Sequence, residues 1–126
     1  GYLLGKDKYR KIADKCDEVV GEIKVTTEEN YQKAQRPVKG YTLAEYISSM
    51  VAFNKQYKGK FIFEVTIIKD YDDDESIHKI KNIIERISPD KIIITRIEDE
   101  RFTKKLGIPD ERFMEISNTI LCSTIN

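Results

Sequence analysis

Two charged side chains interrupt an apolar segment near the start of the chain. The segment EVVGEIKV, residues 18–25, has the valines and isoleucine of a buried strand, yet Glu22 and Lys24 stand within it. Residues two apart on a strand point to the same side of the sheet, so this carboxylate and this ammonium are neighbours. Burying charged groups costs free energy unless they are paired or solvated. The pair therefore indicates either a ligand site or a sheet face in water, and spacing alone leaves both open.

Two later segments continue this pattern. FIFEVTII carries Glu64 and Thr66 at alternating positions, and KIIITRI contains Arg96 close to its end. In a (β/α) barrel one face of every strand looks into the lumen, and active sites gather at the carboxyl ends of the strands. A polar lumen of this kind could hold a zwitterionic ligand. The predicted site residues are Glu22, Lys24, Glu64 and Thr66, with Arg96 as a further candidate.

The elements that must position these residues follow from hydrophobic periodicity. Predicted strands cover residues 18–25, 61–68 and 91–97, and a charged irregular loop covers residues 98–107. Alternation of apolar strands with helices favours a parallel sheet with right-handed crossovers. We therefore predict an α/β fold, a partial (β/α) barrel with three parallel strands alternating with helices. The predicted helices cover residues 6–16, from Thr27 to a stop at Pro37 and Gly40, from Thr42 to about Tyr57, 75–87, and from Pro109 onward.

Composition limits the partners of the chain. It has 126 residues, 40% of them apolar, and a formal net charge of zero, so nothing in its charge attracts nucleic acid or an anionic membrane. No apolar run is long enough to cross a bilayer, and the first residues lack the pattern of a signal peptide. We expect a cytoplasmic protein. In such a protein Cys16 and Cys122 are expected to be reduced and buried.

Several kinds of chemistry lack their motifs. Neither G-x-G-x-x-G nor G-x-x-x-x-G-K occurs, so no Gly-rich loop cradles a phosphate. His78 is the only histidine, which leaves no serine or cysteine triad to build, and we expect it on the surface. The acidic segment DYDDDES offers oxygen ligands for Mg²⁺ or Ca²⁺, but it lacks the spacing and the glycine of a calcium loop. We expect this segment to begin a helix, and we predict no metal site.

The succession of strands and loops resembles the radical S-adenosylmethionine superfamily. DEVVGEIKVTTEENYQKAQRP is similar to the fourth-strand region of these proteins, FEVTIIKDYDDDESIHKI to the fifth strand with its acidic loop, and SPDKIIITR to the sixth. The likeness is nearest to wyosine-synthase-like Fe–S oxidoreductases and to pyruvate formate-lyase-activating enzyme. It covers nearly all of the chain, and no single motif in it is specific.

The superfamily's cluster motif, C-x-x-x-C-x-x-C, is absent from the chain. A [4Fe–4S] cluster needs thiolate ligands, so the resemblance implies a single domain, residues 1–126, that is the C-terminal half of such a barrel. By the same likeness Lys24 would hold the carboxylate of S-adenosylmethionine and Glu22 would steady Lys24. Glu64 and Glu98 depart from the activase pattern. The full-length parent would bind S-adenosylmethionine and the cluster, and this chain alone would bind neither.

The resemblance implies a fragment of a radical enzyme that cleaves S-adenosylmethionine reductively. The fragment would supply part of the cofactor pocket and would be inactive alone. Its partners would be the missing N-terminal half of the barrel and a substrate that the sequence does not identify. A half barrel has open strand edges, so we also expect the chain to self-associate. The alternative is a non-catalytic α/β interaction module.

Overall fold

The computed structural model describes residues 11–34 and 42–123. The predicted helix at residues 6–16 lies partly outside this range, with residues 11–13 helical, and the predicted helix stop at Pro37 and Gly40 lies wholly outside it. The elements in chain order are β1 (Glu18–Ile23), α2 (Glu28–Ala34), α3 (Leu43–Gln56), β2 (Lys60–Ile67), α4 (Asp74–Ile87), β3 (Lys91–Arg96), α5 (Glu100–Leu106) and α6 (Asp110–Ser123).

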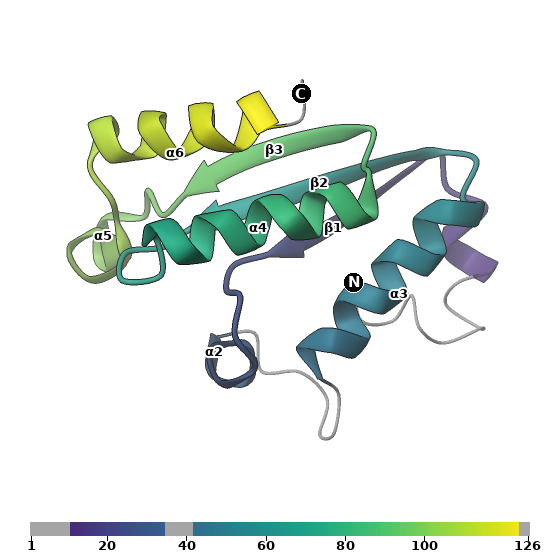
Figure 1. Ribbon diagram of the computed structural model, residues 1–126, viewed down its shortest axis with the longest axis horizontal. Coiled ribbons are helices and arrows are strands. Elements are labelled where there is room, and N and C mark those ends of the chain that lie inside the picture. The colour runs from purple at the N-terminus through teal and green to yellow at the C-terminus, as the bar shows by residue number, and fades with distance from the viewer. Residues whose placement is uncertain (1–10, 35–41, 124–126) are drawn as a thin grey trace.

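The three strands form one parallel sheet in the order β1-β2-β3. Helices α3, α4 and α6 run back against the strand direction and pack on one side of this sheet, as Figure 1 shows. Parallel strands require such crossover connections, because a tight turn cannot return the chain to the starting end of the sheet. The predicted fold class is confirmed: three parallel strands alternate with helices in an open sheet, which is consistent with a partial (β/α) barrel.

The core lies between the sheet and these helices. Alternate residues of the central strand, namely Phe61, Phe63, Val65 and Ile67, are at most 2% exposed. Helix α4 presents an apolar stripe to them because its isoleucines recur at helical spacing, and α3 and α6 add further apolar side chains. The main helix residues in this core are Met50, Phe53, Ile77, Ile80, Ile84, Ile87, Ile116 and Ile120.

The helices begin as their sequences predict. The hydroxyl of Thr42 accepts a hydrogen bond from the backbone N–H of Glu45 at 3.1 Å, which satisfies a donor in the first turn of α3. Asp73 does the same for Ser76 at the start of α4. Each of α3, α4 and α6 also has a carboxylate in its first turn, which Asp110 supplies in α6.

The expectation of an irregular loop at residues 98–107 is wrong, because α5 occupies most of it. Asp99 caps this short helix by accepting from the backbone N–H of Arg101 at 2.9 Å. No side chain of α5 is buried. Its only apolar residues are Phe102 and Leu106, so the periodicity from which helices are predicted is too short to recognise here.

The expectation that both cysteines are buried is also wrong. Cys16 and Cys122 are free thiols, and both are exposed. Cys16 lies in the turn that precedes β1, where its backbone carbonyl, rather than its thiol, contacts the core by accepting from the hydroxyl of Tyr57 at 2.5 Å. Cys122 lies near the end of α6, beyond the last buried residue of that helix, Ile120.

Among the described residues, no helix has both the length and the apolar character needed to cross a membrane.

Candidate functional site

One face of the sheet has no described helix over it. We call this the open face. Its residues alternate with those that enter the core, and none of them belongs to the core cluster. Exposure varies along it, from 7% for Ile62 on the central strand to 53% for Val20 on β1. The open face includes Val20, Glu22, Lys24, Ile62, Glu64, Thr66, Ile93 and Thr95, with Glu18, Lys60 and Lys91 at the end where the strands begin.

The four residues that the sequence predicts as a site all lie on this open face. Lys24 Nζ is 3.9 Å from Glu22 Oε1, and the two side chains are 34% and 44% exposed. A pair this accessible contributes little to stability because water screens it. Glu22 is also the register partner of Glu64 on β2, so two carboxylates are neighbours across the strands. The chain therefore collects more negative than positive charge at the centre of this face.

Thr66 differs from the other predicted residues because it is only 7% exposed. Its hydroxyl lies 3.1 Å from the hydroxyl of its register partner Thr95 on β3. The two hydroxyls satisfy each other, so the central strand can bury a polar group at this position. The structure thus brings Glu22, Lys24, Glu64 and Thr66 together, and what they bind stays a prediction.

Arg96 is not on the open face, and its place in the predicted lumen is wrong. Its guanidinium donates to Asp110 at 2.6 Å and stacks over the ring of Phe113, with 5.0 Å to the ring centroid. The reason is strand parity, since Arg96 shares its side of β3 with Ile92 and Ile94, which pack against the core. Arg96 therefore ties β3 to α6.

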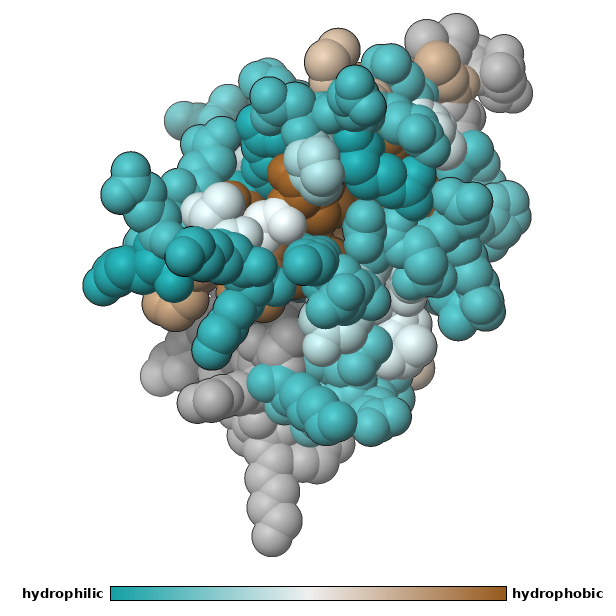
Figure 2. Space-filling model, turned by 90° about the vertical axis from the view of Figure 1, so that its left-hand side faces the viewer, coloured by the Kyte–Doolittle hydropathy of each residue, from teal (hydrophilic) through white to brown (hydrophobic). Residues whose placement is uncertain are grey.

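A cavity opens at the carboxyl edge, the end of the sheet toward which all strands run. Figure 2 looks onto this end and shows apolar surface in a central hollow framed by hydrophilic side chains. The cavity holds about 550 Å³ and lies between the loop after β2 and the connection from α5 to α6. Asp70 in its wall has a φ of 74°, a left-handed conformation that is uncommon outside glycine. The lining residues are Lys69, Asp70, Asp72, Thr103, Gly107, Ile108 and Pro109.

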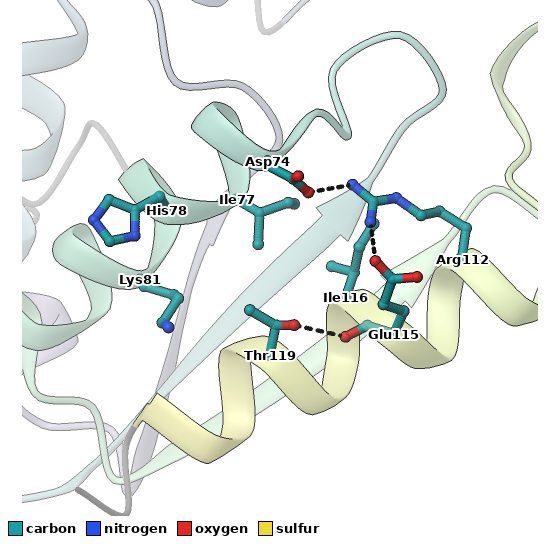
Figure 3. A pocket seen from close by; sticks show the side chains of 8 residues that line it. All are labelled: Asp74, Ile77, His78, Lys81, Arg112, Glu115, Ile116 and Thr119. Carbon is teal, nitrogen blue, oxygen red and sulfur yellow. Dashed lines mark hydrogen bonds and ion pairs between the residues drawn. The ribbon is translucent and has the colours of Figure 1, made fainter.

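A smaller groove of about 220 Å³ lies between α4 and α6. Figure 3 shows Arg112 at one end of it, reaching from α6 to Asp74 at 3.2 Å and to Glu115 at 2.6 Å. The same guanidinium also donates to the backbone carbonyl of Asp72. Arg112 thus fastens α6 to the acidic loop, and no sequence motif marks it among the many charged residues of the chain. His78, which lines this groove, is exposed as predicted.

The acidic loop has structural partners. Asp73 Oδ1 accepts from the Ser76 hydroxyl at 2.7 Å, and this hydrogen bond lowers the pKa of Asp73 below its ordinary value. Asp72 and Asp74 are both bound by Arg112. In residues 11–34 and 42–123 there is no group of three or more His, Cys, Asp or Glu placed to hold a metal ion.

Comparison with known proteins finds a distant relative of the chain. No model of a known protein family matches the chain. The chain is 24% identical over 113 residues to the GTPase Obg of Brachyspira hyodysenteriae (strain ATCC 49526 / WA1). The match covers 88% of this chain but only 17% of that protein. The chain therefore spans a small part of the relative's length.

The resemblance to the radical S-adenosylmethionine superfamily is wrong, since no family model supports it and the relative that is found is a GTPase. The interpretation of the chain as a fragment of a radical Fe–S oxidoreductase is withdrawn with it. The physical reason is that any parallel α/β unit repeats apolar strands and polar loops in this order. The specific part of the motif, three cysteines, was absent from the chain. The expectation that a full-length parent binds S-adenosylmethionine and a [4Fe–4S] cluster rests on that resemblance alone, so it has no further support.

Proposed function

We propose that the chain is a non-catalytic α/β interaction module that binds another polypeptide on its open face. The observation that carries this proposal is that helices cover only one side of the sheet. On the side without helices, Val20 is 53% exposed. Neighbouring apolar and charged side chains on one accessible surface are typical of protein interfaces that form and dissociate.

Charge on the open face specifies the partner. Glu22 and Glu64 are cross-strand neighbours with like charge. Lys24 forms an ion pair with Glu22, at 3.9 Å. Like charges placed opposite each other are destabilising, and a cation between them relieves that repulsion. A partner segment with lysine or arginine beside an apolar side chain would satisfy both carboxylates and cover Val20. We therefore expect a basic, partly apolar segment.

The match to part of a longer protein supports a module. Its similar region occupies 17% of a longer protein, as expected for a unit that works attached to others. GTP hydrolysis does not carry over, because the six glycines of this chain are never spaced as G-x-x-x-x-G-K. Among the described residues His78 is exposed, which does not favour a catalytic base there.

A peptide selection tests the proposal. A random peptide library displayed on phage is selected against the immobilised chain, and the Kd of the recovered peptides is measured by calorimetry. We expect peptides rich in lysine or arginine, and Glu64→Lys should weaken their binding about tenfold or more, since a charge-assisted contact contributes about 1.5–3 kcal/mol.

The matched control is Glu85→Lys, the same change at an exposed position of α4 on the opposite side of the molecule. This variant should bind the peptides as the wild type does. If selection recovers no binding peptide, or if both variants lose binding equally, the open face is not the binding surface and the proposal is wrong.

A further inference from the structure

β3 is an edge strand whose apolar side chains are incompletely covered. In the part of the chain that the structure describes, it pairs with β2 on one side only. Its three consecutive isoleucines, Ile92, Ile93 and Ile94, are all only half-buried. An apolar edge strand with free backbone donors and acceptors is a template for pairing with another strand.

The other edge strand, β1, is protected by charge. Glu18 and Glu22 stand at both ends of its exposed segment, and charged side chains on an edge oppose strand addition. β3 has charge only at its two ends, Lys91 and Arg96, and Arg96 is already bound by Asp110 at 2.6 Å. Both edges thus carry charge at their ends, but on β3 the charge of Arg96 is paired with Asp110 and the four residues between Lys91 and Arg96 are uncharged. β3 is therefore the edge better suited to pairing.

Helix α6 extends the apolar surface beside β3. Met114 is 62% exposed and Leu121 is 42% exposed. They are seven positions apart, so they lie on one stripe of the helix. The flank of α6 toward α4 carries Arg112, Ile116 and Thr119, which line the groove between these helices. Met114 and Leu121 each lie two positions along the chain from one of these residues, about 200° around the helix, and therefore on the flank away from α4.

We propose that a second copy of this chain pairs with β3 in antiparallel orientation, so that the strands of both copies form one continuous sheet. With the twofold axis at Ile94, Ile93 lies opposite Thr95 of the second copy and Lys91 lies opposite Ile97. Between Lys91 and Ile97 no like charges face each other in this register, and the next pair, Asp90 and Glu98, lies beyond the ends of the strand. An isologous contact of this kind closes after two copies.

The axis is perpendicular to the sheet, so both sets of helices stay on the same side. The outer flanks of the two α6 helices then meet in antiparallel orientation, with Met114 of each copy near Leu121 of the other. A short strand pair alone buries less than the roughly 1,000 Å² that a specific interface needs, so contact between these helix flanks is required for a stable dimer. The open faces remain accessible, so this dimer goes beyond the proposed function and does not depend on it.

Sedimentation velocity over a range of protein concentrations is the first test. We expect a concentration-dependent dimer for the wild type. Replacing both exposed residues of α6, Met114→Lys with Leu121→Lys, should raise the dimer Kd about tenfold or more, since two buried apolar side chains are lost. Both positions are exposed in one copy, so the fold should remain.

Val20→Lys is the matched control, because Val20 is an exposed apolar residue on the other edge strand. It should leave the dimer unchanged. A wild type that stays monomeric at all concentrations overturns the proposal, and so does a control that weakens the dimer as much as the α6 substitutions do.

Cross-linking tests the register. In a Cys16→Ser, Cys122→Ser background, Ile93→Cys should form a covalent dimer with a short bismaleimide, because diagonal residues of an antiparallel pair are about 7–8 Å apart. Val20→Cys should not cross-link. Equal cross-linking of both variants would contradict the proposed pairing. A dimer in which neither variant cross-links would also contradict it, because the contact would then lie elsewhere.

Discussion

The two faces of the central strand β2 show how one backbone supports two different tasks. Phe61, Phe63 and Val65 face the helices and are fully buried. Their immediate neighbours Ile62 and Glu64 face the opposite way, and Glu64 retains contact with water. On the helix side all of these residues enter the core, whereas the open face combines the 7% exposed Ile62 with a carboxylate that is only partly buried. The uncovered side is free to carry charge that the fold does not need.

The largest expected effect is on the helix side. Phe63→Ala removes a ring that is 0% exposed and should lower the free energy of unfolding by about 3–5 kcal/mol, because it leaves a cavity in the core. Glu64→Ala, one residue away on the open face, should change it by no more than about 0.5 kcal/mol. Urea denaturation followed by circular dichroism measures both values. Similar losses of stability for the two variants would contradict the difference between the two faces.

A medium effect is expected where the covering helix α4 begins. Asp73→Ala removes the carboxylate that accepts from the backbone N–H of Ser76, and should cost about 1 kcal/mol. Asp73→Asn should retain most of the stability, since asparagine caps equally well. Thermal melts of the three proteins at neutral pH measure this difference, and a loss in Asp73→Asn as large as in Asp73→Ala would show that charge rather than capping matters.

The same cap has a pH dependence of known sign. The hydrogen bond from Ser76 lowers the pKa of Asp73 in the folded state, so the carboxylate stabilises the fold fully above its unfolded pKa of about 3.9. This stability is lost as the pH falls through the folded pKa. Asp73→Asn cannot titrate at this position, so the stability difference between wild type and variant should shrink on acidification below about pH 4.

The smallest effect is expected on the open face. Glu64→Gln removes the repulsion with its register partner Glu22 and should stabilise the chain by about 0.2–0.5 kcal/mol at low salt. The gain should fade as salt screens the charges. Glu85→Gln, on the outer side of α4, should not show this gain. A Glu64→Gln variant that is less stable than the wild type would indicate that attraction holds this carboxylate in place.

The period of the apolar residues was enough to predict the sheet, because two of its strands alternate clearly between apolar and polar positions. β3 was the exception. Its segment KIIITRI is apolar on both sides, so the sequence does not indicate which of its residues face the core. For this reason Arg96 is predicted on the wrong face. α5 was missed because it has too few apolar residues to show a periodicity. Arg112 has two acidic partners, Asp72 and Asp74, that only the fold brings near it.

The candidate site was partly predictable for the same reason. Glu22, Lys24, Glu64 and Thr66 alternate within clear strands, so their common face followed from spacing. Their ligand did not follow, because a charged strand face looks alike whether it binds a cofactor, a peptide or water. The cavity at the carboxyl edge is lined by residues more than thirty positions apart in the chain, such as Lys69 and Thr103. No local sequence pattern predicts it.

The carboxylates in the first turns of the helices set the electrostatic potential at the carboxyl edge. Because α3, α4 and α6 all run against the strands, their dipoles point the same way and place partial positive charge, about half a unit each, at that edge. Helix N-termini arranged so commonly receive phosphate. Here Glu45, Asp74 and Asp110 already occupy that role from within the chain. Two of these acids also bind arginines, Asp74 with Arg112 and Asp110 with Arg96, so the carboxyl edge presents paired charges where a phosphate group would have to enter.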